Sequence, residues 1–223
     1  MKNQKKTLLL LLFMALFIAF TEIFAVSEKI YPLSLHRKGK VYSQKMSVSK
    51  SNGETIVNFT DEKGERSMNR FGAGLRALET KYYDKSGIEY MRIVFDYTKK
   101  EIVLTGKVKD DYNIDRVTYD GNGSMFYVFS RIIPKPGKKI IFDILQSKSG
   151  RVVAMYLVYE KTEEIIIAGK TYKAKKYESG LHNRVLKTFW PYKYYYWFDV
   201  KNNRFLKYEG PGEGKKTERI ESP

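Results

Sequence analysis

The sequence has 223 residues and a formal net charge of +16, from 41 Lys and Arg against 25 Asp and Glu. It contains no cysteine and only two histidines, which excludes a disulfide scaffold, a lipidated N-terminal cysteine and the usual zinc sites with nitrogen and sulfur ligands. We therefore expect no metal and no cofactor, and a core stabilised by apolar burial alone, for which 43% apolar residues are sufficient.

The N-terminus has the architecture of a secretory signal peptide. Lys2, Lys5 and Lys6 precede the apolar run Leu8–Phe20, and a cleavage point follows Ala25. The run is shorter than the roughly 20 residues that span a bilayer. The pattern predicts export to the periplasm after removal of residues 1–25, and a single domain over residues 26–223. An uncleaved anchor in the inner membrane is the alternative.

Strand patterns separated by turns fill the chain from Ile30 to Lys109. Asn52-Gly53 predicts a tight hairpin, because the favoured hairpin turns need positive φ. The glycine-containing loop Phe71–Leu75 predicts a bend rather than a phosphate-binding loop, because it lacks the further Gly and the Lys of such loops. The expected strands are Ile30–Arg37, Lys40–Ser49, Thr55–Thr60, Arg76–Asp84, Ile88–Tyr97 and Glu101–Lys109, with a weak pattern over Arg66–Phe71.

One helix interrupts the strands. Apolar residues recur at helical spacing over Met125–Ile133, with Pro134 and Pro136 just beyond. Ser124 is expected to cap the helix start through its hydroxyl. Because the helix is apolar nearly all round, we expect it to be buried.

The C-terminal part returns to strands. Three are expected in quick succession, Arg151–Tyr159, Glu164–Ala168 and Thr171–Tyr177, with a tight turn at Gly169. The first is apolar on both faces and should be covered on both. The other expected strands are Lys138–Gln146, Tyr192–Val200, Arg204–Tyr208 and Lys216–Ile220.

Together these elements predict a mainly β fold, in which a curved antiparallel sheet forms an incomplete barrel with one short helix packed in or over it. A transmembrane barrel is not favoured, because charges such as Lys173, Lys175 and Lys176 crowd the strands.

Nothing in the sequence spacing indicates catalysis. His36 and His182 are isolated, and no serine lies in a nucleophile-elbow frame. Asp96, Asp120, Asp143 and Asp199 lie mostly beside turns, where aspartate is common. We expect a protein that is not an enzyme; a hydrolase would need paired carboxylates in a cleft.

Four segments give the chain a family resemblance: VFDYTKKEIVL, YDGNGSMFYVFSRI, EEIIIAGKTYKAKKYE and YYWFDVKNNRFLKYE. Their order resembles DUF3108, a family of exported bacterial proteins without an assigned activity. The resemblance covers roughly residues 30–221. It implies a fold similar to that of the lipoprotein carriers LolA and LolB, an unclosed barrel around a helical lid with an apolar cavity.

The leading expectation is a periplasmic protein that holds a hydrophobic ligand, a lipid or a lipid-modified partner such as a lipoprotein. The candidate cavity lining consists of apolar and aromatic residues of the helix and two strands: Met125, Phe126, Phe129, Met155, Tyr156, Leu157, Tyr194 and Trp197. The alternative is an envelope module that binds an anionic membrane surface, anionic glycan, lipopolysaccharide or another envelope protein through a basic, tyrosine-rich surface. Export makes nucleic acid an unsuitable partner.

Overall fold

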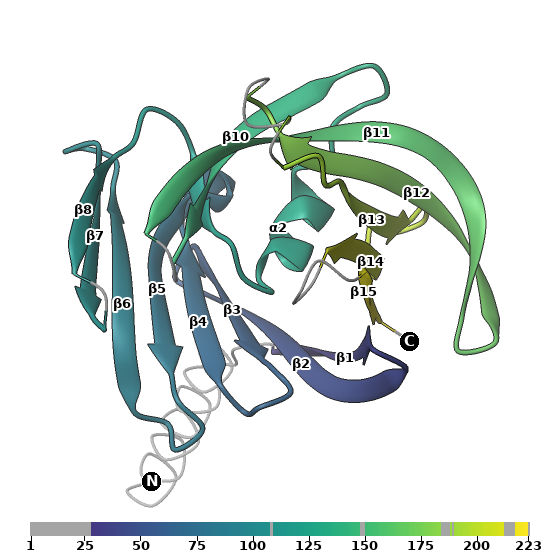
Figure 1. Ribbon diagram of the computed structural model, residues 1–223, viewed down its shortest axis with the longest axis horizontal. Coiled ribbons are helices and arrows are strands. Elements are labelled where there is room, and N and C mark those ends of the chain that lie inside the picture. The colour runs from purple at the N-terminus through teal and green to yellow at the C-terminus, as the bar shows by residue number, and fades with distance from the viewer. Residues whose placement is uncertain are drawn as a thin grey trace, which may run out of the picture.

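The computed structural model describes residues 28–107, 109–147, 150–183, 188, 190–211 and 217–222 (Figure 1). The expected signal peptide, residues 1–25, lies outside the described residues. No helix in the described part is long and apolar enough to cross a membrane.

The described residues form fifteen strands, one α-helix and one 3₁₀ turn. The strands are β1 (Lys29–Arg37), β2 (Lys40–Ser51), β3 (Glu54–Thr60), β4 (Arg66–Phe71), β5 (Ala77–Tyr83), β6 (Glu89–Asp96), β7 (Glu101–Gly106), β8 (Asp110–Asn113), β9 (Thr118–Asp120), β10 (Lys139–Gln146), β11 (Arg151–Ile167), β12 (Lys170–Leu181), β13 (Tyr194–Asp199), β14 (Phe205–Pro211) and β15 (Thr217–Glu221). The helix is α2 (Met125–Arg131), and the 3₁₀ turn is η1 (Ala73–Leu75).

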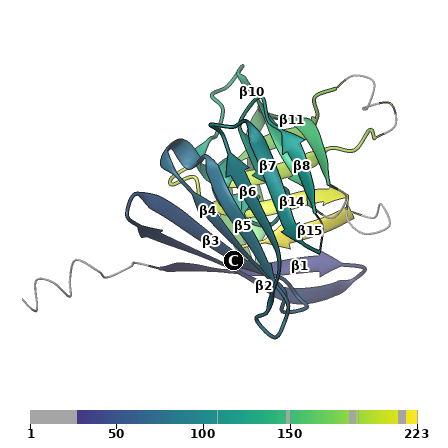
Figure 2. The same cartoon turned by 90° about the vertical axis from the view of Figure 1, so that its left-hand side faces the viewer.

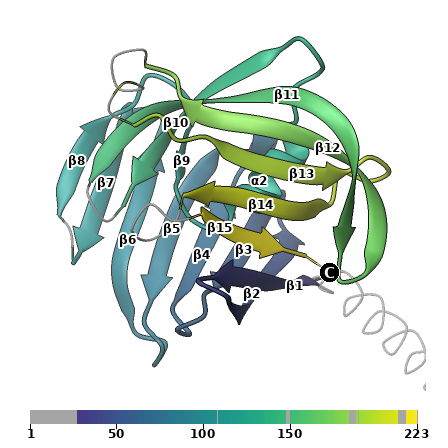
Figure 3. The same cartoon turned by 45° about the vertical axis from the view of Figure 1, so that its right-hand side comes forward.

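All fifteen strands belong to one sheet, in the order β8-β7-β6-β5-β4-β3-β2-β1-β15-β14-β13-β12-β11-β10-β9. Neighbouring strands are antiparallel except β9 and β10, which are parallel. The sheet curls into an incomplete barrel whose two edge strands, β8 and β9, do not pair with each other (Figures 1 and 3). The side view shows β4 to β8 as one continuous wall (Figure 2). The expected fold class is confirmed.

The tight turns predicted at Asn52-Gly53 and at Gly169 are confirmed. Asn52 and Gly53 have φ of 50° and 76°, as a primed turn requires. Ala168 and Gly169 have φ of 48° and 77° at the β11–β12 turn. The loop at Phe71–Leu75 is a bend, with η1 and a register shift between Arg70 and Phe71.

Three expectations about the elements are wrong. The segments Arg151–Tyr159 and Glu164–Ala168 are a single strand, β11, because a register shift between Tyr159 and Lys161 absorbs the polar interruption while pairing with β12 continues. Two short strands, β8 and β9, were not expected.

The third correction concerns the start of the helix. Ser124 has α-helical φ and ψ and makes no side-chain cap, and its buried hydroxyl has no partner among the described residues. The N–H groups of the first helical turn instead bond to the backbone carbonyls of Asn122, Gly123 and Ser124, while Asn122 Oδ1 accepts a hydrogen bond of 2.8 Å from the Ser124 N–H. The helix also ends at Arg131, two residues earlier than expected.

The helix lies inside the curled sheet (Figure 1), and aromatic side chains fill the space around it. Phe126 stacks on Phe205 with ring centroids 4.3 Å apart. Phe129 meets Phe142 at 5.2 Å and Tyr196 at 4.9 Å, both edge to face. The interior around α2 is therefore a packed core.

Candidate ligand-binding cleft

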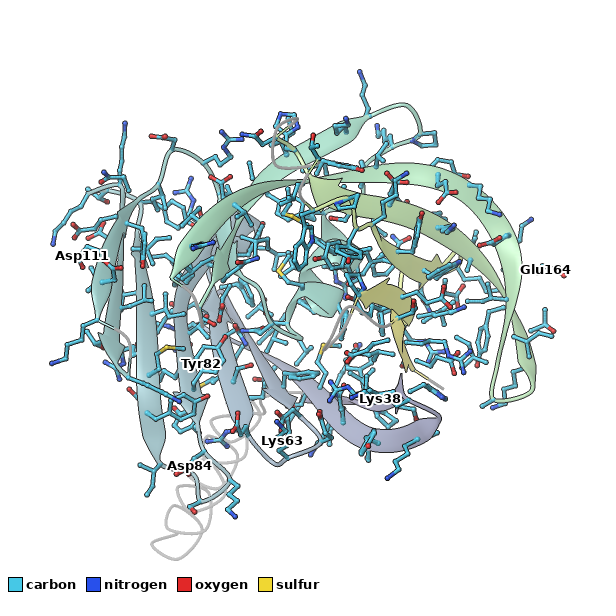
Figure 4. All side chains as sticks on the ribbon, viewed as in Figure 1. Lys38, Lys63, Tyr82, Asp84, Asp111 and Glu164 are labelled. Atoms are coloured by element: carbon cyan, nitrogen blue, oxygen red, sulfur yellow. The ribbon has the colours of Figure 1, made fainter. Side chains whose placement is uncertain are left out.

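A cavity of about 860 Å³ lies beside this core. It is formed by β3 to β6, the turn before α2, the end of β10 and the residue after β7. The lining consists of Phe59, Asp61, Glu65, Arg66, Ser67, Tyr82, Asp84, Tyr90, Met91, Lys107, Gly121, Asn122, Gly123, Gln146 and Ser147. This set is called the cleft below. Figure 4 labels Tyr82 within the sheet and Asp84 at its rim.

A hydrogen-bonded polar cluster lies at the base of the cleft. The Tyr82 hydroxyl donates to Oδ2 of Asp120, the last residue of β9. Asn122 Nδ2 donates to the same Oδ2 over 2.8 Å, and Ser147 Oγ lies 3.2 Å from the Tyr82 hydroxyl. Strands far apart in the sequence are thus joined where the cleft ends.

Asp120 is 3% exposed, and its environment is unusual for a carboxyl group. Burial raises the pKa of Asp120 to about 6, although hydrogen bonds from Tyr82 and Asn122 act in the opposite direction. Burial, and then the nearby charge of Asp120, raise the pKa of Tyr82 well above its usual value. Oδ1 of Asp120 is buried without a hydrogen-bond partner in the described part, although the nearby Gly121 N–H and Ser147 hydroxyl also lower the pKa of this carboxyl group.

Asn69 extends this cluster into the sheet. Its Oδ1 accepts hydrogen bonds from Asn122 Nδ2 over 2.9 Å and from Thr80 Oγ1 over 3.0 Å, and its Nδ2 donates to the Val57 carbonyl over 3.3 Å. Asn69 is 1% exposed, so these bonds satisfy a fully buried amide. They hold the turn before α2 against β4 and β5.

Three aromatic side chains, those of Phe59, Tyr82 and Tyr90, line the cleft among mostly polar residues. The rings of Tyr82 and Tyr90 are 6.1 Å apart, and Phe59 meets Phe126 of the core at 6.4 Å. Gly123 lies directly against Phe59, because a Cβ atom at this position would come within 2.2 Å of the Phe59 ring. Only glycine allows the helix start to approach this wall.

Carboxylates gather at the rim. Asp61 and Asp84 each begin a hairpin turn, and Oδ1 of each accepts two backbone hydrogen bonds of 2.8 to 3.0 Å from that turn. Glu65 belongs to the first turn. The pKa of the Tyr90 hydroxyl is raised, first by burial and then by the charges of Glu65, Asp61, Asp120 and Asp84. Four negative charges therefore act on one side chain of the cleft.

A second cavity of about 240 Å³ lies at the other end of α2. Its cationic lining residues are Lys29, Arg131 and Arg204, and none of its lining residues is acidic. The two cavities therefore differ in charge.

The structure brings six of the eight predicted lining residues to one core and places two elsewhere. Met125, Phe126, Phe129 and Leu157 are buried in the core, and Met155 and Tyr194 pack against it. Trp197 belongs to a separate cluster with Ile167, Ala174 and Leu206. Tyr156 belongs to neither cluster, and its hydroxyl donates to Glu178 over 2.6 Å. Phe126 also lines the second cavity, and none of the eight lines the cleft.

The candidate polar residues are scattered. His36 Nε2 lies 3.3 Å from Glu221, outside the cleft, and His182 is exposed. Asp96 and Asp199 accept hydrogen bonds from turn N–H groups, and Asp143 lies 3.4 Å from Arg116. Asp120 alone of the four aspartates considered lies at the cleft. No group of three or more His, Cys, Asp or Glu side chains in the described part could hold a metal.

Sequence reasoning missed the cleft because its residues are separated along the chain. From the sequence alone, Asp120-Gly121-Asn122-Gly123 predicts only a turn. The available signal was the alternation of polar Asp and Asn with two glycines before a buried helix, which indicates close backbone approach to another element.

No protein-family model matches the chain, and no curated protein matches it. A beta-barrel-like protein of the domain of unknown function DUF1849 from Brucella abortus is a similar solved structure. Its TM-score is 0.50 at 11% identity, over 88% of this chain and 97% of that chain. The likeness is one of fold.

The hypothetical lipoprotein YmcC from Escherichia coli (K12) aligns with a TM-score of 0.39 at 13% identity, over 87% of this chain and 85% of that chain. The DUF3108 resemblance stays a prediction.

Proposed function

We propose that this is an exported, non-enzymatic protein that holds a small amphipathic molecule, with an apolar chain and a polar end, in the cleft of its half-open barrel. The observation that carries the proposal is the combination of three aromatic side chains with a hydrogen-bonded polar base in one cavity of about 860 Å³. Ligand sites are typically cavities of about 300–1,000 Å³ with mainly apolar walls and a few polar groups.

The position of the cleft refines the sequence-based expectation. The residues around α2 are packed against one another, and the cavity at the end of α2 measures only about 240 Å³, against about 860 Å³ for the cleft. The free volume lies where Phe59 and Met91 meet the polar cluster of Tyr82. The apolar chain of the ligand is expected to lie along Phe59 and Met91, and the polar end of the ligand is expected to point toward Tyr82 and Ser147.

Export is proposed from the basic and apolar pattern of residues 2–25. The carboxylates at the rim of the cleft support the proposal that the protein binds its ligand without transforming it. Asp61 and Asp84 use one carboxylate oxygen each to hold a turn, a structural task that explains their presence without catalysis.

The alternative function, binding of anionic envelope material by the tyrosine-rich surface, has less support. Lys193 lies 2.7 Å from Glu178, Lys176 lies 3.0 Å from Glu160, and Lys207 lies 2.7 Å from Glu209. Because these lysines are paired with carboxylates, the tyrosine-rich strands carry little uncompensated positive charge at these positions.

The proposal is tested by gently purifying the full chain, extracting it with organic solvent and identifying released molecules by mass spectrometry. Ser147→Trp, which fills the cleft, should lose the bound molecule. Ser86→Trp, at an exposed turn, is the matched control and should retain it. Absence of any co-purified molecule, together with no binding of a fluorescent fatty acid, would refute the proposal.

A further inference from the structure

We propose that the second cavity, of about 240 Å³, binds a tetrahedral oxyanion, either free phosphate or the phosphate group of a larger molecule. This cavity shares no lining residue with the cleft, so the inference does not depend on the proposed function. Sites for drug-sized ligands typically measure about 300–1,000 Å³. A cavity of this size therefore suits a small group.

Several parts of the chain meet at this cavity. The strands β1, β15, β14 and β13 are consecutive in the sheet (Figure 3). Lys29 begins β1, and Ser222 directly follows β15. Asn202 and Asn203 lie between β13 and β14, and Arg131 ends α2. Donors from different elements can therefore surround one group, which suits an oxyanion with four oxygens better than a flat carboxylate.

The positive charges of the cavity are not neutralised by carboxylates. None of the lining residues is acidic. Lys29 and Arg131 are exposed and form no ion pair with any described residue. By contrast, Lys176, Lys193 and Lys207 each lie within 3.0 Å of a glutamate. The cavity therefore has a positive field that attracts an anion.

Aromatic rings hold both guanidinium groups of the lining. The Arg131 guanidinium lies 5.3 Å from the Tyr127 ring centroid, and that of Arg204 lies 5.8 Å from the Tyr172 ring centroid. Arginine presents N–H donors in a planar fork that can bind two phosphate oxygens at once. Because stacking already restricts these side chains, less conformational entropy is lost when they bind an anion.

Ser222 supplies an independent observation. It is 2% exposed and lines the cavity, yet its hydroxyl makes no hydrogen bond with any described residue. Its backbone N–H donates to the Leu206 carbonyl over 2.8 Å, which fixes the residue beside β14. Buried hydroxyl groups are normally paired, because an unsatisfied one costs free energy. An oxyanion in the cavity would accept the missing hydrogen bond.

The turn between β13 and β14 adds two amide groups. Asn202 Oδ1 accepts a hydrogen bond from the Arg204 N–H over 2.9 Å, and Asn203 Oδ1 accepts one from Lys175 Nζ over 3.1 Å. Because both partners are donors, the accepting atoms are the amide oxygens, and each Nδ2 is a donor. Neither Nδ2 makes a hydrogen bond with a described residue. Both amides therefore have N–H groups left to donate to an anion.

The test measures binding of inorganic phosphate to the full chain by isothermal titration calorimetry. About 150 mM NaCl screens nonspecific attraction between exposed charges. Sulfate should compete with phosphate, and acetate should compete at least about 10-fold more weakly. Dihexanoyl phosphatidic acid, below its micelle concentration, distinguishes the two sources. Binding at least about 10-fold tighter than that of inorganic phosphate indicates the phosphate group of a lipid, and equal or weaker binding indicates free phosphate.

Three variants locate the site. Arg131→Gln and Ser222→Ala should each weaken phosphate binding by at least about 5-fold, and the second does so without a change in net charge. Lys170→Gln, at the exposed β11–β12 turn and outside the lining, loses the same charge as Arg131→Gln and should bind like wild type. Urea unfolding checks that each variant is folded.

Three results would each overturn the inference and leave the proposed function standing. The first is no binding at about 10 mM phosphate. The second is equal competition by acetate. The third is unchanged affinity in Arg131→Gln or Ser222→Ala, or a loss in Lys170→Gln as large as that in Arg131→Gln.

Discussion

Tyr82 on β5 and Asp120 on β9 share a hydrogen bond that joins one edge strand of the sheet to a strand near its other edge. The two residues are 38 positions apart, and β9 is the last strand in the sheet order while β5 is the fourth strand from the other edge. This contact, with those of Asn122, closes one end of the cleft and positions the start of α2. The stability of the site therefore depends on a buried carboxyl group.

The first prediction concerns pH. Asp120 titrates near 3.8 in the unfolded chain and at about 6 in the folded protein, so the folded state binds this proton more tightly. Its contribution to the free energy of unfolding is present below pH 4 and is lost as pH rises through 6, by about 3 kcal/mol. Asp120→Asn removes this titration. In urea unfolding, the free energy of unfolding of the variant should rise by about that amount relative to that of wild type when the pH is raised from 4 to 7.

The variant must be compared with wild type, because other carboxyl groups also make the stability of the protein depend on pH. Hydrogen bonds and nearby charges lower the pKa of Glu62 and of Glu163 despite their burial, in the opposite direction to the pKa of Asp120. A difference between the two proteins that does not change with pH would contradict the assignment of Asp120.

The second prediction concerns the core around α2. Phe129 is 2% exposed and packs between Phe142 and Tyr196. Phe129→Ala should lower the free energy of unfolding by about 3–5 kcal/mol, because it removes a large buried side chain and leaves a cavity. Ile166→Ala is the control, since Ile166 is 71% exposed and its loss should cost less than about 0.5 kcal/mol. A loss under about 1 kcal/mol for Phe129→Ala would show that the helix does not pack as described.

The third prediction tests the contact between the helix start and the cleft wall. Gly123→Ala should destabilise the protein by about 1–3 kcal/mol, because the added methyl group overlaps the Phe59 ring. Phe59→Ala should relieve much of this cost, so that the double variant loses less than the sum of the two single changes. Additive losses in a double-mutant cycle measured by urea unfolding would refute the contact.

The fourth prediction concerns Asn69. Asn69→Ala leaves Asn122 Nδ2 and Thr80 Oγ1 without one acceptor, and it should cost about 2 kcal/mol or more. Hydrogen exchange should accelerate at the N–H groups of Gly121 and Ser124 more than in β1 and β2. Uniform acceleration along the chain would indicate general destabilisation rather than release of the turn before α2.

The elements that were predicted correctly are determined by residues that lie close together in the sequence. Asn52-Gly53 and Gly169 determine their hairpins locally, and helical spacing over Met125–Arg131 identifies α2. By contrast, β8 has no alternating pattern, because Asp110–Asn113 is a short edge strand without a buried face. β8 is recognised as a strand only through its pairing with the neighbouring strand β7.

The residues predicted to line a cavity show the same limit of prediction from local sequence. Alternation along β13 separates Tyr194 from Trp197, and the structure does place them in different clusters. Periodicity distinguishes the two faces of a strand but does not say which face is inside. The cleft could not be predicted for a related reason: Phe59, Tyr82 and Asn122 meet only when the sheet curls.

The location of a bound chain tests the account most directly. Crystals of the full chain, soaked with a C10 alcohol that carries a terminal bromine, should give an anomalous peak beside Phe59 and Met91. The hydroxyl group should lie on the side of Tyr82. A bromine peak only at α2 between Phe126 and Phe205, or no peak in a crystal that retains an open cleft, would contradict the claim that this cleft holds the ligand.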